Sequence, residues 1–164
     1  MSAPASAAVA APQLSFADPP RQARVPRISP VQPPEGPAGD RAPLVLIAED
    51  HEDSRDALRT LLDAFGYRVV EAENGREAVE LALAERPDLI LMDMMMPQVD
   101  GFQATREIRA SEGLRDVPIV ALTAMEGARE RVLQAGCDDM VAKPLDVRAF
   151  LAKMRIWTHP GTQA

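Results

Sequence analysis

The stretch from Leu89 to Pro97 places an acidic side chain where it can do chemistry. Residues 89–92 form a short apolar run, as expected of a strand buried on both faces, and Asp93 follows where such a strand would emerge. A buried carboxylate is costly unless it is paired or binds a metal, and the carboxyl ends of strands in an open α/β sheet are where ligands sit. Asp93 is therefore a candidate reactive residue, although a turn after a strand explains an isolated aspartate equally well.

Polar side chains also follow other apolar runs along the chain. The residues at these predicted strand ends are Glu49, Asp50, Asp93, Thr123 and Lys143. In a parallel sheet all such ends lie along one edge, so we expect these five side chains to share one pocket. Each residue alone has an ordinary explanation as a solvated turn, a local backbone contact or a surface charge, but their joint placement at four strand ends indicates a site.

The chemistry of this set is that of phosphoryl transfer. Three crowded carboxylates repel and raise one another's pKa values, and a hard divalent cation such as Mg²⁺, which takes a few oxygens and several waters, removes the conflict. Lys143 supplies a point charge and Thr123 a hydroxyl donor for phosphate oxygens. Carboxylates are known nucleophiles in phosphoryl chemistry, which makes Asp93 the predicted acceptor.

Helical periodicity separates the predicted strands and sets the fold class. The predicted strands are 44–48, 67–72, 89–93, 117–123 and 140–142. The first predicted helix is capped by Asp53 or Ser54 and continues to Phe65, and three others cover 77–86, 101–112 and 128–134. The last is capped by Asp146 and runs from Val147 to about Trp157. Strands and helices alternate five times, which predicts an α/β fold with a doubly wound five-stranded parallel sheet and helices on both faces.

Composition divides the chain into an arm and a domain. Ten of the 15 prolines lie before Leu44, and residues 1–43 lack hydrophobic periodicity, so they are predicted to be a disordered, proline- and alanine-rich arm. Residues 44–157 suffice for one core, and 158–164 are a short tail. Of the net charge of −7, the arm carries about +1 and the rest about −8, which argues against direct DNA binding.

The lone cysteine and the hydropathy pattern bear on location. Cys137 has no partner for an internal disulfide and is expected to be a structural thiol in a reducing compartment. No apolar run approaches the roughly 18 residues of a membrane span, and the N-terminus lacks the pattern of a secretory signal. The sequence therefore predicts a cytoplasmic protein with no membrane partner.

Three further features are expected to be structural. His51 directly follows the acidic pair and is interpreted as an exposed turn residue in preference to a metal ligand or phosphate acceptor. A soft-metal site is not expected at the four methionines around Asp93, because the neighbouring cluster offers only oxygen ligands. These methionines are Met92, Met94, Met95 and Met96. Trp157 is expected to pack the last helix.

Five motifs together resemble the receiver domain of two-component response regulators. They are 44–50 (LVLIAED), 89–97 (LILMDMMMP) with Asp100-Gly101, 119–124 (IVALTA), 135–139 (AGCDD) and Lys143-Pro144. The resemblance covers about three quarters of the chain. It implies a flavodoxin-like sheet of order 2-1-3-4-5 with five helices.

The resemblance also implies a role for each site residue. Asp93 would accept a phosphoryl group from a phosphohistidine on a sensor histidine kinase or histidine phosphotransfer protein. Glu49, Asp50, Asp93 and the backbone carbonyl of Met95 would hold Mg²⁺. Lys143 would contact the phosphoryl group. Thr123 would move onto it and couple it to the surface formed by the fourth helix, fifth strand and fifth helix. The output would be contact with an unidentified downstream protein or onward phosphotransfer.

Two departures from the family pattern concern the output. Met140 falls where the family usually has a switch Tyr or Phe, and the spacing from Thr123 to Lys143 is about two residues short. A flexible Met can still repack. We therefore expect an altered output face with the phosphorylation chemistry intact.

Other function classes remain open on the sequence alone. A degenerate receiver would bind partners without phosphorylation. An aspartate-based phosphohydrolase usually has a second acid two residues after the nucleophile, where this chain has Met95, which cannot act as a general acid. A nucleotide- or flavin-binding protein would need a glycine-rich loop after the first strand, and this chain has Glu49-Asp50 there.

Overall fold

The computed structural model describes residues 41–159, in which five strands alternate with five helices. The strands are β1 (Leu44–Ala48), β2 (Arg68–Ala72), β3 (Leu89–Asp93), β4 (Ile119–Thr123) and β5 (Asp139–Ala142). The helices are α1 (Glu52–Ala64), α2 (Gly75–Glu85), α3 (Gly101–Ala110), α4 (Arg129–Ala135) and α5 (Val147–Thr158). The predicted alternation is confirmed, with boundaries that differ by at most three residues.

All four strand pairings are parallel, in the order β2-β1-β3-β4-β5, as expected. The register pairs Ala48 with Met92 and Asp93 with Leu122. Thr123, the last residue of β4, pairs with Ala142. The residue that follows each strand therefore emerges at one common edge, which is the physical basis of the site.

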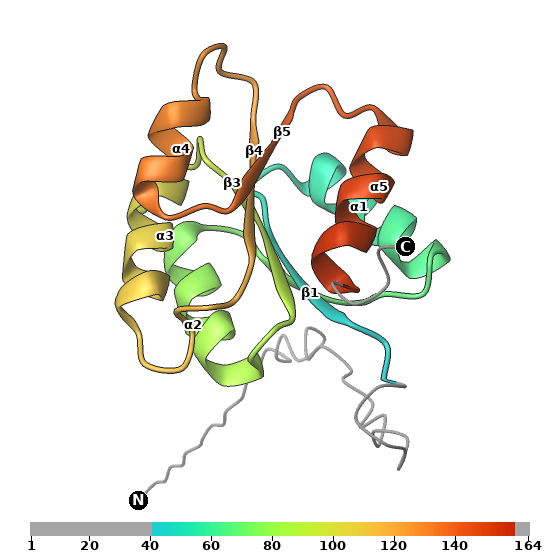
Figure 1. Ribbon diagram of the computed structural model, residues 1–164, viewed down its shortest axis with the longest axis horizontal. Helices are drawn as coiled ribbons and strands as arrows, with labels where there is room; N and C mark the ends of the chain where they lie inside the picture. The colour runs from blue at the N-terminus through green and yellow to red at the C-terminus, as the bar shows by residue number, and fades with distance from the viewer. Residues whose placement is uncertain (1–40, 160–164) are drawn as a thin grey trace, which may run out of the picture. The chain divides into compact units, whose positions relative to one another are not determined.

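Helices cover the sheet on both faces, with α1 and α5 on one side and α2, α3 and α4 on the other (Figure 1). Alternate residues of β1 divide between the two cores: Leu46 and Ala48 face one, and Val45 and Ile47 face the other. Every residue of β1, β3 and β4 is buried. Burial on both faces explains why these strands are continuous apolar runs.

Helix α1 begins earlier than predicted, so the proposed caps Asp53 and Ser54 are wrong. The N-cap is His51, whose carbonyl accepts the Arg55 N–H at 2.9 Å, and its side chain makes no capping bond. Helix α4, with Ala128 at its N-cap, also lacks a side-chain cap, whereas the remaining three helices begin with a capping side chain. Asn74 caps α2, Asp100 caps α3 and, as predicted, Asp146 caps α5.

Strand β4 is two residues shorter at its start than predicted. The Val117 carbonyl accepts the Arg109 guanidinium at 2.6 Å, and Pro118 has no N–H to donate to a ladder. Arg109 also binds the carbonyls of Gly136 and Arg115 and the Asp138 carboxylate. The Arg109 side chain thus holds the segment between α3 and β4 in place by hydrogen bonds to its carbonyls. Helical periodicity alone did not indicate this role.

The arm predicted over residues 1–43 lies outside the described residues except for 41–43, and the tail predicted over 158–164 lies outside them except for 158 and 159, so both remain predictions. Thr158, the first residue of the predicted tail, is the last residue of α5. Within residues 41–159, none of the helices has the length and apolar character needed to cross a bilayer.

Candidate functional site at the carboxyl edge of the sheet

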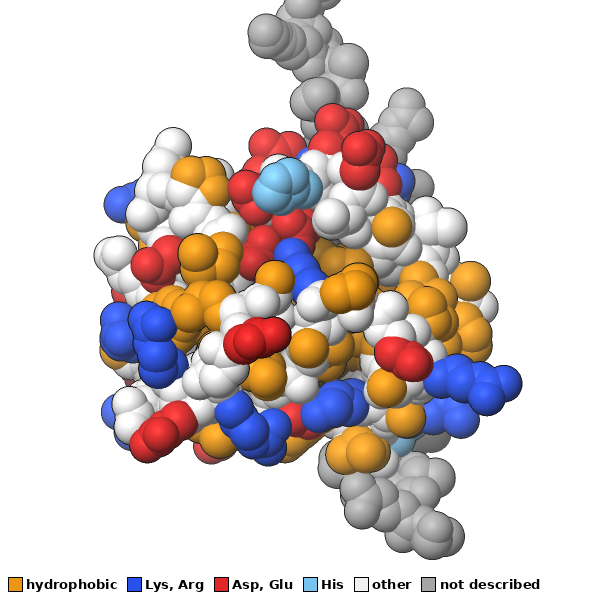
Figure 2. Space-filling view, turned by 90° about the horizontal axis from the view of Figure 1, so that it is seen from above, with side chains coloured by type: hydrophobic (Ala, Val, Ile, Leu, Met, Phe, Trp, Pro, Cys, Tyr) orange, Lys and Arg blue, Asp and Glu red, His pale blue; other side chains and the backbone are white. Residues whose placement is uncertain are grey.

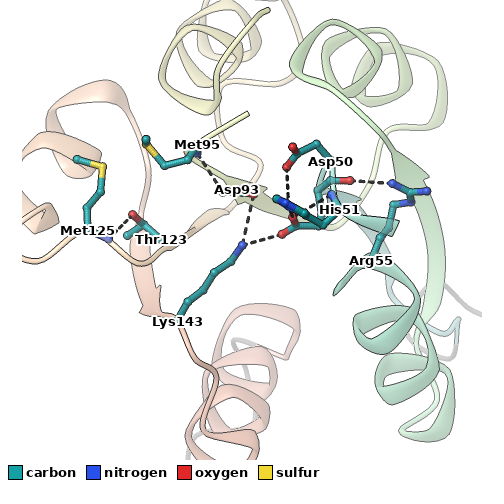
Figure 3. Close-up of polar contacts among 9 residues, drawn as sticks. Asp50, His51, Arg55, Asp93, Met95, Thr123, Met125 and Lys143 are labelled. Atoms are coloured by element: carbon teal, nitrogen blue, oxygen red, sulfur yellow. Dashed lines mark hydrogen bonds and ion pairs between the residues drawn. The ribbon is translucent and has the colours of Figure 1, made fainter. Parts of the chain in front are cut away.

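Lys143 joins the ends of three strands. Its Nζ lies 2.8 Å from Glu49 Oε2, after β1, and 3.3 Å from Asp93 Oδ2, at the end of β3 (Figure 3). Both carboxylate side chains are almost fully buried, whereas the Lys143 side chain is 28% exposed. Residues 50 and 94 positions apart in the sequence therefore form one polar cluster, as the strand-end pattern predicted.

Glu49 is held by contacts from helix α1 that the sequence reasoning missed. Arg55 donates to the Glu49 carbonyl at 3.0 Å and lies 3.6 Å from Glu71 of β2. The His51 N–H donates to Glu49 Oε1 at 3.2 Å. A signal for Arg55 was present: it falls on the buried face of α1, in helical spacing with Leu58 and Leu62.

The two buried acids differ in electrostatics. The pKa of Asp93 is raised to about 6, mainly by burial and also by the negative charge of Glu49 and the contact between the two acids. The Met95 N–H and Lys143 favour the ionised form of Asp93, but their effect is smaller. Burial also acts against ionised Glu49, but Lys143 and the His51 N–H outweigh it, and the pKa of Glu49 falls below its usual value. The pKa of Lys143 rises because the two acids outweigh its own desolvation. Burial, more than mutual repulsion, is thus the main cause of the raised pKa.

Asp50 supplies the observation that tests whether a cation fits here. Its Oδ1 is a buried oxygen with no hydrogen-bond partner, one of two such side-chain atoms among residues 41–159. Oxygen donors from Glu49 and Asp50 lie within 4.8 Å of each other and of His51 Nδ1. A hard divalent cation would satisfy the unpartnered oxygen and the excess negative charge, so the residues present fit Mg²⁺.

Thr123 lies at the same edge but does not contact Asp93 in this structure. Its side chain is buried, and Oγ1 accepts the Met125 N–H at 3.0 Å (Figure 3). The Thr123 carbonyl accepts the Lys143 N–H at 2.9 Å. The predicted contact between Thr123 and a phosphoryl group therefore remains a prediction that requires movement.

The loop after β3 places a backbone donor on Asp93. The Met95 N–H donates to Asp93 Oδ1 at 3.0 Å, and the Met95 side chain is exposed. The loop returns tightly at Gly101, where a Cβ would lie 2.6 Å from the Met94 Cα and would clash with the Asp93 carbonyl. Gly101 thus allows α3 to start directly against the end of β3. Met92, Met94 and Met96 are buried and serve the core.

The site opens onto a surface of uneven character. Acidic side chains gather at one place along the carboxyl edge, beside a region of apolar side chains (Figure 2). A groove of about 480 Å³ adjoins the Glu49–Lys143 pair and is lined mainly by apolar side chains of α1 and of the segment from β5 into α5. These include Ala57, Leu58, Leu61, Pro144, Leu145 and Val147.

Other predicted features are located as follows. Met140 is half-buried against the core on the α2–α3–α4 side. Trp157 packs against the opposite core and donates to Asp139 at 3.1 Å, which confirms its structural role. Cys137 is a buried free thiol whose pKa burial raises to about 11. Helix α4 has seven residues, the fewest of the five described helices.

Comparison with known proteins gives a consistent result. The profile of the response regulator receiver domain family matches residues 45–155. The polar-differentiation response regulator DivK of Brucella anthropi is 40% identical over 113 residues, which cover 68% of this chain and 92% of DivK.

Two solved structures are similar at the level of both sequence and fold. One is the receiver domain of a sensor histidine kinase from Pseudomonas aeruginosa, with a magnesium ion coordinated in its active-site cleft; it is 41% identical, with a TM-score of 0.67, and the match covers 71% of this chain and 98% of that one. The other is the Ssk1 receiver domain of Saccharomyces cerevisiae in complex with the phosphotransfer protein Ypd1; it is 30% identical, with a TM-score of 0.67, covering 71% and 89%.

Proposed function

Because the chain belongs to the response regulator receiver domain family, we propose that Asp93 is its phosphoacceptor in a two-component phosphorelay. The observation that carries this proposal is the Lys143 ammonium, which bridges Glu49 and Asp93 across three strand ends. A carboxylate that is buried, held in place by a backbone N–H and adjacent to a fixed positive charge suits transfer to its own oxygen.

The transfer reaction follows from this arrangement. An Asp93 carboxylate oxygen attacks the phosphorus of a phosphohistidine, the new P–O bond forms and the P–N bond to the imidazole breaks. The leaving nitrogen takes a proton, and the histidine of the partner is restored. Lys143 offsets charge on the phosphoryl oxygens, and the Met95 N–H orients the Asp93 carboxylate before attack.

Glu49 and Asp50 are the proposed Mg²⁺ ligands, together with Asp93 and the Met95 carbonyl. When bound, Mg²⁺ supplies charge neutralisation for the phosphoryl oxygens. Arg55 keeps Glu49 in position through its backbone carbonyl, so the Glu49 side chain stays directed toward Lys143. We assign Thr123 as the residue that moves to the phosphoryl group and leaves its bond with the Met125 N–H.

A helix of the phosphohistidine donor is the partner that best fits the groove beside Lys143. The groove lies between α1 and the start of α5 and is apolar, and Glu49 and Lys143 form its inner end. A helix packed there would bring a histidine side chain to Asp93. In the yeast Ssk1 complex a receiver domain is bound to a phosphotransfer protein, which supports a donor of this class. We place the protein in the cytoplasm, in keeping with the free thiol of Cys137.

The alternative of a phosphohydrolase is not favoured by the residue that stands two positions after Asp93. Met95 occupies the position of the second acid, and its side chain offers a thioether that cannot donate a proton. A phosphorylation-independent interaction module is also disfavoured, because the buried and partly unpaired carboxylates cost stability that such a module would not need.

The direct test is the intact mass of the full chain after incubation with acetyl phosphate and Mg²⁺. We expect one added phosphoryl group on the wild-type chain, and none on Asp93→Asn or without a divalent cation. Asp100→Asn is the matched control, because Asn can also cap α3 and the charge change is the same. Labelling of Asp93→Asn equal to that of the wild type would overturn the assignment.

A second arm of this experiment tests the groove with histidine kinases and phosphotransfer proteins of the source organism as donors. Val147 and Leu133 are both exposed apolar residues, but only Val147 lines the groove. We expect Val147→Glu to slow transfer from the protein donor and to leave labelling by acetyl phosphate unchanged, whereas Leu133→Glu alters neither. Equal effects of the two variants on protein transfer would exclude this groove.

A further inference from the structure

The His51 imidazole lies against both proposed metal ligands of strand β1. Its Nδ1 is 3.3 Å from Glu49 Oε1 and 3.3 Å from Asp50 Oδ1 (Figure 3). The second of these oxygens is the buried atom that has no hydrogen-bond partner. His51 is therefore more than an exposed turn residue, even though its side chain is 73% exposed.

The spacing of these three donor atoms suits a shared cation. Ligands at Zn²⁺ distances of about 2.1 Å in tetrahedral geometry lie roughly 3.4 Å apart, close to both separations from His51. The Glu49 and Asp50 donors lie within 4.8 Å of each other, so only a small inward movement is needed. Because His51 precedes the first turn of α1 and its ring is in solvent, that movement meets little resistance.

The two oxygens of Glu49 have separate roles, so a cation on the His51 side does not compete with Lys143. Oε2 accepts the Lys143 ammonium at 2.8 Å. Oε1 faces His51 and accepts its backbone N–H. The Lys143 ammonium can therefore keep its contacts with Glu49 Oε2 and Asp93 Oδ2 while Glu49 Oε1, Asp50 and His51 bind an ion.

We propose that His51 Nδ1 is a third protein ligand at the acidic pair and extends this site to divalent cations that accept nitrogen, such as Zn²⁺. Mg²⁺ takes oxygen ligands and gains little from an imidazole, whereas Zn²⁺ binds imidazole strongly. Three protein ligands with an open fourth position is a common zinc arrangement. The inference rests on the metal site of the proposed function, but not on phosphoryl transfer.

The test measures cation binding to the untagged full chain by calorimetry, with no phosphoryl donor present. We expect His51→Gln to lower the affinity for Zn²⁺ at least tenfold, because losing even a residue that only supports a metal ligand typically costs about that much. The Mg²⁺ affinity of this variant should stay within about twofold of the wild-type value. Because the chain has two histidines, His159→Gln is the matched control, with both affinities unchanged. Glu49→Gln should weaken both ions.

Nuclear magnetic resonance of ¹⁵N-labelled histidine gives an independent readout. One equivalent of Zn²⁺ should shift the His51 Nδ1 signal and leave His159 unchanged, while Mg²⁺ should leave both imidazoles unchanged. An unshifted His51 signal at Zn²⁺ saturation, or equal losses of Mg²⁺ and Zn²⁺ affinity in His51→Gln, would overturn the proposal. If the wild-type chain bound neither ion, the metal site itself would fail. Labelling of Asp93 by a phosphoryl donor is a separate measurement.

Discussion

Two aspartates at opposite edges of the sheet have surroundings that shift their pKa values in opposite directions. Asp93, at the end of β3, shares one lysine with Glu49, and its pKa is raised to about 6, mainly by burial. Asp139, at the start of β5, has three donors to itself: the Lys153 ammonium at 2.7 Å, its neighbouring backbone N–H and the Trp157 indole. Burial opposes its charge too, but these donors outweigh it and lower the pKa of Asp139.

The difference shows what distinguishes the proposed phosphoacceptor from a structural carboxylate in this molecule. At the carboxyl edge, two buried acids share one ammonium, which leaves negative charge that a bound cation would offset. The Asp139 carboxylate instead links β5 to α5 through its ion pair with Lys153. Arg129 Nη1 of α4 lies 3.9 Å from Asp139 Oδ1. Asp93 is more deeply buried and shares its ammonium with Glu49, whereas Asp139 is partly exposed and has more donors. Depth of burial and the number of donors together separate these two aspartates.

Removal of the shared lysine should give the largest effect. Lys143→Met leaves Glu49 and Asp93 buried without a counter-charge, and we expect a loss of about 2–4 kcal/mol in the free energy of unfolding at pH 7.5 without metal, less than for a fully buried pair because Lys143 is partly exposed. Urea unfolding measures it. Lys153→Met, with similar exposure, removes one of three donors and should cost about 0.5–1 kcal/mol. Equal losses would refute the comparison.

Neutralising Asp93 should raise the free energy of unfolding, in contrast to the removal of Lys143. The folded-state Asp93 pKa of about 6 lies above the ordinary 3.8, so its contribution to stability is present below about pH 4 and is lost as pH rises through 6. Without metal, Asp93→Asn should therefore be more stable than the wild type by about 1–3 kcal/mol at pH 8, with the gain vanishing near pH 4. Urea midpoints across this range measure the gain, which Asp100→Asn should lack. A gain that does not change with pH would contradict the assignment.

Neutralising Asp139 is expected to have a smaller effect than neutralising Asp93. The folded-state pKa of Asp139 is lowered, so its contribution is present above about pH 4 and is lost as pH falls. Asp139→Asn should cost about 0.5–1.5 kcal/mol at neutral pH, because Asn still accepts one bond but loses the ion pair. Trp157, the chain's one tryptophan, should report the change through its fluorescence. A stabilised Asp139→Asn would show that this carboxylate resembles Asp93 after all.

The altered output face remains a prediction, but the structure indicates where its difference lies. Met140 packs on the α2–α3–α4 side of the sheet, while its neighbour Asp139 holds α5 on the other. The backbone bond from the Lys143 N–H to the Thr123 carbonyl joins Thr123 to the segment that follows β5. A polar tie and a flexible side chain therefore occupy the region where the family usually has an aromatic ring.

Much of the fold could be predicted because burial on both faces leaves a strong pattern. Strands β1 and β3 were predicted within a residue, since each is a continuous apolar run bounded by polar residues. The start of β4 was misplaced because Val117 and Pro118 are apolar yet belong to a turn held by Arg109. The start of α1 was misplaced because the chain turns at His51 without a capping side chain.

The sequence by itself determined which residue types end each strand, and so it predicted Glu49, Asp50, Asp93 and Lys143 as one site. Strand-end position is a local property, which one apolar run and its following residue reveal. The strand order came from the motifs that resemble the receiver family, because local patterns do not specify which strands are neighbours.

Only the tertiary structure decided how these residues share their contacts. It gave Asp93 a raised pKa and Asp139 a lowered one, brought Arg55 to the Glu49 carbonyl and directed the His51 ring at Asp50. Each of these outcomes depends on distances between side chains from different elements and on the water excluded around them. Such distances arise from packing, and no local pattern in the sequence encodes them.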